Sequence, residues 1–121
     1  MPRGFSPVLT AAALLVAVPL DAKAELAMQS LTYICDRGVQ MYATYVNASE
    51  GSAAILQVEG RQVAMELAIS GSGARYAEAT DETGGSTGYI WWTKGDEAFL
   101  QWQSSATTEA VTILDNCRAN P

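Results

Sequence analysis

The chain contains no histidine and only two cysteines among its 121 residues. Histidine is the commonest general base and the usual partner of a nucleophilic serine or cysteine, so these forms of catalysis lack their base. A metal site built from cysteine and histidine is excluded for the same reason. The glycines follow neither the phosphate-loop nor the dinucleotide-binding pattern. The sequence therefore predicts a protein that is not an enzyme and that carries no metal or other cofactor.

Carboxylate pairs do not replace the missing histidine. Asp96 and Glu97 are adjacent on a presumed strand, where neighbouring side chains point to opposite faces. A glycosidase needs two carboxyl groups that face one substrate. The pair is therefore a poor candidate for acid–base catalysis.

Long apolar runs are absent except near the start of the chain, over residues 8–20. Arg3 precedes this run, and an Ala-x-Ala site at residues 22–24 follows it, which is the order of a secretory signal peptide. The run is too short to span a bilayer comfortably, and no cysteine near its end is available for acylation. We expect residues 1–24 to be cleaved, leaving one exported domain over residues 25–121 without a membrane anchor.

Basic side chains are scarce. After residues 1–24 are removed, five basic and twelve acidic side chains remain, a formal charge of −7. Such a surface repels nucleic acid and anionic lipid and attracts basic partners. A merely solubilising acidic surface is the alternative. The negative charge therefore argues against nucleic-acid and membrane partners. For a basic protein partner it is supporting evidence only.

The two cysteines, Cys35 and Cys117, lie near the two ends of the expected domain. In an exported chain, such a widely spaced pair most simply forms one disulfide. The ends of the domain should then lie side by side.

The apolar residues mostly alternate with a period of two, which is typical of strands. Turn residues separate the alternating segments, and no helix is indicated. The segments cover residues 31–35, 39–46, 53–58, 61–69, 74–79, 89–93, 97–103 and 111–117. Antiparallel sheets of this size manage their exposed edges by closing into a barrel or by stacking. We predict an all-β fold, a small antiparallel barrel of about eight strands, with an exposed loop over residues 80–88.

Two segments carry a family signature, residues 70–76 (SGSGARY) and residues 91–98 (WWTKGDEA). In these motifs the sequence resembles the MliC/PliC family, the membrane-bound and periplasmic inhibitors of c-type lysozyme. The flanking frame matches too, at residues 33–35 (YIC), 116–117 (NC) and 120–121 (NP). Without an acylated cysteine, the chain resembles the periplasmic branch. The resemblance spans nearly the whole mature chain.

The resemblance implies a function and a site. In the family, the serine before Gly-Ala-Arg-Tyr and the lysine of the Lys-Gly-Asp turn enter the lysozyme cleft, and here they correspond to Ser72 and Lys94. A c-type lysozyme works with two carboxyl groups in a cleft, which a compact ammonium on a tight turn can reach. We expect a periplasmic inhibitor that occludes the cleft without a covalent step. The remaining members of the predicted lysozyme-binding set are Gly73, Arg75, Tyr76, Gly95 and Asp96.

Several points stay open at this stage. Without the resemblance, Ser72 and Lys94 would be ordinary loop residues. A structural pairing of Arg75 and Tyr76 near Asp96 or Glu97 is an alternative to direct contact with lysozyme. Trp91 and Trp92 point to opposite faces of a strand, so one should be core and the other partly exposed, and the sequence does not say which.

The alternative function is a non-enzymatic periplasmic barrel that binds a small ligand or another envelope protein. The loop at residues 80–88 is longer than the family pattern, and the sequence leaves three interpretations of it open: a disordered segment, a contact with lysozyme or a contact with a second copy. An exposed strand edge leaves a homodimer open.

Overall fold

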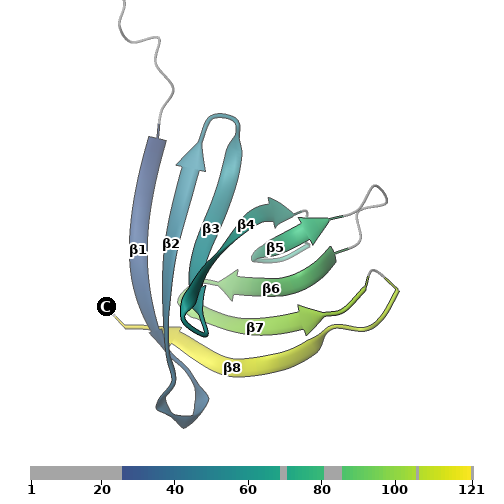
Figure 1. The fold of residues 1–121 in the computed structure, drawn as a ribbon. Helices are drawn as coiled ribbons and strands as arrows, with labels where there is room; N and C mark the ends of the chain where they lie inside the picture. Colours follow the sequence, from purple (N-terminus) through teal and green to yellow (C-terminus); the bar gives the residue numbers. More distant parts are fainter. Residues whose placement is uncertain (1–25, 69–70, 81–85, 106, 121) are drawn as a thin grey trace, which may run out of the picture.

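The computed structural model describes residues 26–68, 71–80, 86–105 and 107–120, so the expected leader lies outside the described residues. Eight antiparallel strands follow one another around a closed barrel, each paired with its neighbour in sequence (Figure 1). This confirms the predicted fold. The strands are β1 (Leu26–Ile34), β2 (Gln40–Ala48), β3 (Gly51–Val58), β4 (Arg61–Ala68), β5 (Ala74–Thr80), β6 (Ser86–Lys94), β7 (Glu97–Gln103) and β8 (Val111–Ala119), and a 3-10 turn, η2 (Asp36–Gly38), lies between β1 and β2.

The barrel closes where the end of β8 meets the end of β1. Tyr33 of β1 faces Ala119 of β8, and Ile34 faces Arg118. These are the two positions at which β1 and β8 pair. The disulfide between Cys35 and Cys117 lies beside this junction, as predicted, and joins positions 82 residues apart. Figure 1 shows β1–β3 running across the direction of β6–β8, with the C-terminus beside the lower end of β1.

The core contains aromatic side chains that are hydrogen-bonded to one another. Trp91 is fully buried, and its Nε1–H donates to the Tyr45 hydroxyl at 2.8 Å. The hydroxyls of Tyr45 and Tyr33 are 2.6 Å apart. Burial raises the pKa of both phenols, because the charged form would lose its hydration. Trp91 is thus the core tryptophan that the sequence left undecided, and Trp92 lies on the outer face.

β1 begins well before its predicted start at residue 31. β1 begins at Leu26, although its first five residues are exposed on both faces and so lack the alternation that marks a half-buried strand. They are extended because each faces a residue of β2, from Leu26 opposite Ala48 to Ser30 opposite Thr44. Backbone pairing, not burial, forms this part of the strand.

The predicted exposed loop over residues 80–88 is wrong at its ends. β5 continues to Thr80, and β6 begins at Ser86, so only residues 81–85 separate the strands, and these lie outside the described residues. The register shifts at Glu78, whose carboxylate accepts the Tyr89 backbone N–H at 2.9 Å. Gly88 has φ +84, and a Cβ there would collide with the Glu78 carboxylate. The hairpin therefore continues past a bulge, into residues that we predicted as loop.

Candidate functional site

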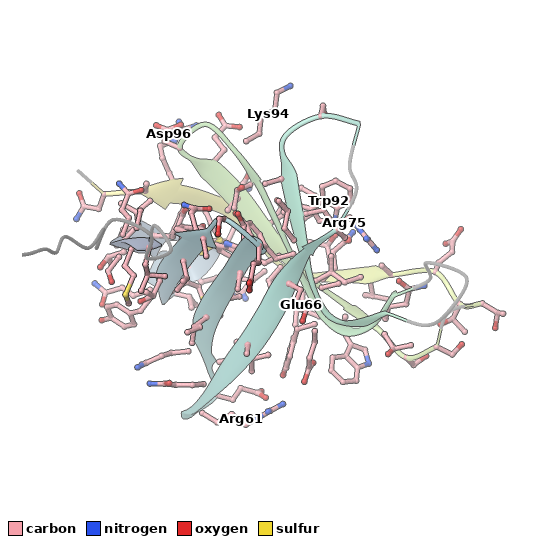
Figure 2. The ribbon with its side chains drawn as sticks, turned by 90° about the horizontal axis from the view of Figure 1, so that it is seen from above. Arg61, Glu66, Arg75, Trp92, Lys94 and Asp96 are labelled. Carbon is pink, nitrogen blue, oxygen red and sulfur yellow. A yellow bond between two sulfur atoms is a disulfide. The ribbon has the colours of Figure 1, made fainter. Side chains whose placement is uncertain are left out.

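The predicted site residues Ser72 and Lys94 lie at the same end of the barrel. β5 and β6 are antiparallel, and Ala74 at the start of β5 faces Thr93 at the end of β6. The Ser72 loop, just before β5, therefore lies beside the turn that follows Lys94. Figure 2 shows Lys94 pointing away from the ribbon at the end of the barrel opposite Arg61.

Gly73 is the point of closest approach between the Ser72 loop and the Lys94 turn. It has φ +73, a conformation that residues with a side chain rarely adopt. A Cβ at this position would collide with the Thr93 carbonyl oxygen and lie 3.3 Å from the Lys94 Cβ. The lack of a side chain at Gly73 is therefore what allows the two loops to pack together.

A groove of about 640 Å³ opens beside these two loops. Its walls come from three consecutive strands and from the Ser72 loop. The lining consists of Ser72, residues 92–94 of β6, residues 97–99 and 101 of β7, and residues 115–118 of β8. Ser72 and Lys94 thus share one surface, so a single partner surface can contact both.

Trp92 forms the aromatic part of the groove wall. The Arg75 guanidinium lies 5.6 Å from its ring centroid, and the Phe99 ring is stacked on it at 5.9 Å. Its Nε1–H donates to Gln101 Oε1 at 2.8 Å. With a cation and a second ring beside it and its only donor satisfied, Trp92 is a fixed part of the wall.

The turn after Lys94 is held by the C-terminal strand. Arg118 Nη1 lies 3.3 Å from Asp96 Oδ1, and its Nη2 lies 2.9 Å from Glu97 Oε2. The Ala119 backbone N–H donates to the Asp96 carbonyl oxygen at 2.7 Å. Asp96 lies in the turn and not in a strand, so both carboxylates reach Arg118 instead of pointing apart.

The other predicted site residues are divided between surface and core. Tyr76 is 7% exposed and packs on the Tyr45 ring at 5.6 Å, so it belongs to the core. Arg75 lies beside Trp92 and well apart from Asp96 in Figure 2. Arg118 therefore takes the place beside Asp96 and Glu97 that the sequence left open as an alternative for Arg75 and Tyr76.

The sequence alone did not indicate Arg118 or the groove walls on β7 and β8. Phe99 lies between two buried residues of β7, and Gln101 follows the second of them, a pattern that places both on the outer face. Arg118 directly follows Cys117, whose bridge to Cys35 was predicted, and this gave a hint of its position. Neither signal indicated that these outer faces border the Lys94 turn.

The chemistry available at this surface is polar and ionic. Both cysteines are joined in the disulfide, so neither supplies a free thiol. Within the described ranges, no group of three or more cysteine or acidic side chains is placed to hold a metal ion. In the same part of the chain, no helix is long and apolar enough to cross a membrane. The groove offers hydroxyl, ammonium, carboxylate and aromatic groups suited to contact with another molecule.

Comparison with known proteins gives consistent matches along most of the chain. The family model of MliC, the membrane-bound lysozyme inhibitor of c-type lysozyme, matches residues 33–109. A membrane-bound lysozyme inhibitor of c-type lysozyme from Cupriavidus necator is 36% identical over 94 residues, which cover 78% of this chain and 68% of the relative.

Two solved structures have a similar fold. PliC, the periplasmic lysozyme inhibitor of c-type lysozyme from Salmonella typhimurium, is similar with a TM-score of 0.62 and 26% identity, over 78% of this chain and 100% of that one. Pseudomonas aeruginosa MliC, solved in complex with hen egg white lysozyme, is similar with a TM-score of 0.60 and 27% identity, over 91% and 100% of the two chains.

Proposed function

The chain belongs to the MliC family, and on that premise we propose that it is an inhibitor of c-type lysozyme that acts in the bacterial envelope. The observation that carries the proposal is the shared surface of Ser72 and Lys94, which line one groove at one end of the barrel. Had they been on opposite sides of the molecule, one lysozyme cleft could not receive both.

The mechanism we propose is occlusion combined with charge pairing. Lys94 is exposed and is the last residue of β6 before a tight turn, so its ammonium can extend into a narrow cleft. The catalytic carboxyl groups of a c-type lysozyme are suitable acceptors for its three N–H donors. Ser72 adds a hydroxyl that can donate and accept. No covalent bond to lysozyme forms, and the protein itself is not an enzyme.

Export is part of the proposal. Cleavage after Ala24 would release residues 25–121 into the periplasm, where the enzyme to be blocked attacks the cell wall. Intact-mass measurement of the protein from a periplasmic extract tests this directly. A mass that still includes residues 1–24 would contradict cleavage at this site.

The test of function is a cell-wall lysis assay with hen egg white lysozyme and the exported protein. We expect inhibition by the wild type and a loss of about thirtyfold or more in affinity for Lys94→Ala, because truncating one partner of a desolvated charge pair costs about 2–5 kcal/mol. Arg61→Ala is the matched control, since it removes one positive charge at the opposite end of the barrel (Figure 2).

The outcomes separate specific insertion from general acidic attraction. Equal effects of Lys94→Ala and Arg61→Ala would refute insertion of Lys94 into the cleft. If the wild type inhibits no c-type lysozyme, that result supports the alternative function, a non-enzymatic barrel that binds a small ligand or another envelope protein.

A further inference from the structure

The charges beside Lys94 form a row across three adjacent strands. Lys94 faces Glu97 in the β6–β7 register, and Glu97 faces Arg118 in the β7–β8 register. Facing residues of antiparallel strands have Cβ atoms roughly 4.5–5.5 Å apart, and opposite charges at such positions attract. Glu97 is therefore within reach of both cations. The cation that it bonds determines whether the Lys94 ammonium is available to a partner.

In the structure, Arg118 holds the carboxylates. Its guanidinium bonds Glu97 Oε2 at 2.9 Å through one nitrogen and Asp96 Oδ1 at 3.3 Å through the other. The planar fork of arginine suits this double contact, whereas a lysine ammonium is a point charge. Among the described residues, none forms a side-chain hydrogen bond or an ion pair with the Lys94 ammonium, and Figure 2 shows the side chain directed away from the barrel.

We propose that Arg118 is a positioning residue for lysozyme inhibition, which withdraws Asp96 and Glu97 from Lys94 and so presents an uncompensated ammonium to the lysozyme cleft. The proposal rests on the proposed function. Without Arg118, two carboxylates would remain beside one cation, and Glu97 would draw Lys94 back across the β6–β7 hairpin. The same carboxylates would also face the carboxyl groups of lysozyme.

The size of the effect follows from the exposure of these groups. Exposed ion pairs and pairs of facing charges are weak. Losing Arg118 should therefore raise the population of Lys94 that is ion-paired with Glu97 only roughly two- to fivefold. Uncompensated negative charge at the entrance to the groove adds to this. We therefore expect Arg118→Gln to weaken inhibition about three- to tenfold, less than the loss expected for Lys94→Ala.

One experiment reads the state of Lys94 without lysozyme. Lys94 is the only lysine beyond residue 23, so acetylation by limiting acetic anhydride can be followed at this one side chain by peptide mass spectrometry. Arg118→Gln should slow acetylation of Lys94 about two- to fivefold, because an ion-paired ammonium is less available. Adding Glu97→Gln to Arg118→Gln removes the competing carboxylate and should restore the rate.

The same variants are then measured in the lysis assay. Arg118→Lys keeps a positive charge beside Glu97 and should recover most of the inhibition, and the Arg118→Gln/Glu97→Gln double variant should also recover it. A purely structural role for Arg118 would leave the acetylation rate unchanged and would not be corrected by removing Glu97.

Each result decides a different question. An unchanged acetylation rate in Arg118→Gln overturns the proposal. So does a slowed rate with normal inhibition, provided that Lys94→Ala has lost inhibition. If the wild type does not inhibit lysozyme, the proposed function fails, while a slowed and restored acetylation rate would still support the withdrawal of Asp96 and Glu97 from Lys94.

Discussion

Gly73 is the position where one added methyl group should separate the two loops of the site. Alanine at φ +73 is strained by about 1–2 kcal/mol, and its Cβ would also collide with the Thr93 carbonyl oxygen. The Ser72 loop must then move away from the end of β6, or the end of β6 must move. We expect Gly73→Ala to lower the free energy of unfolding by about 2 kcal/mol or more.

Two measurements test this substitution. For a domain of this size, about 2 kcal/mol corresponds to a decrease of roughly 8–16 °C in Tm, measured by circular dichroism. Inhibition of lysozyme is measured at a temperature where the variant is still folded. Inhibition should fall at least tenfold, because Ser72 and Lys94 no longer fit one cleft together. Displacing a functional group by about 1 Å can reduce its effect on the order of a hundredfold.

Gly71→Ala is the matched control on the other side of Ser72. A Cβ at Gly71 meets no atom within 4 Å, so both Tm and inhibition should stay close to wild type. If Gly73→Ala behaves like Gly71→Ala, the close packing of the two loops does not position the site and the reasoning is refuted.

Three further predictions concern the barrel itself. Reducing the bond between Cys35 and Cys117, which closes a loop of 82 residues, should lower the free energy of unfolding by about 4.5 kcal/mol in the chain-entropy treatment, as measured by urea unfolding with and without a reductant; an unchanged urea midpoint would contradict it. Tyr45→Phe leaves the Trp91 Nε1–H without its acceptor and should cost about 1–3 kcal/mol in the same assay, with inhibition intact. The raised pKa values of Tyr45 and Tyr33 mean that the unfolded chain loses these protons first, so stability is complete below the unfolded pKa of 10.0 and falls above it, by up to about 1.4 kcal/mol per pH unit for each phenol. In Tyr45→Phe this decline should be shallower, and equal slopes in the two proteins would count against the assignment.

Most strands could be predicted because their signal is local. Alternation of apolar and polar residues appears within five to nine residues of sequence, as in β2, where Met41, Ala43 and Tyr45 are buried and Tyr42 is exposed. The signal failed where a strand is formed by pairing alone. The first residues of β1 have no buried face, and Ser86 belongs to β6 only because the hairpin continues past the bulge at Glu78.

The choice between Trp91 and Trp92 shows the limit of the same signal. Both faces of β6 carry apolar residues, so either tryptophan satisfied the alternation. The register decides, because Trp91 faces the buried Tyr76 and Leu100 on the neighbouring strands. Register depends on the lengths of turns and on bulges, which the pattern of one strand does not contain.

For the site, local motifs and turn residues were enough to place Ser72 in a loop and Lys94 at a tight turn, because these signals are specific within a few residues. The tertiary structure alone decided that Arg118 bonds the carboxylates next to Lys94. That contact joins residues more than twenty positions apart, and it exists because β8 lies beside β7 in a particular register. Local chemistry is encoded residue by residue, whereas the pairing of charges across strands depends on how the whole barrel closes.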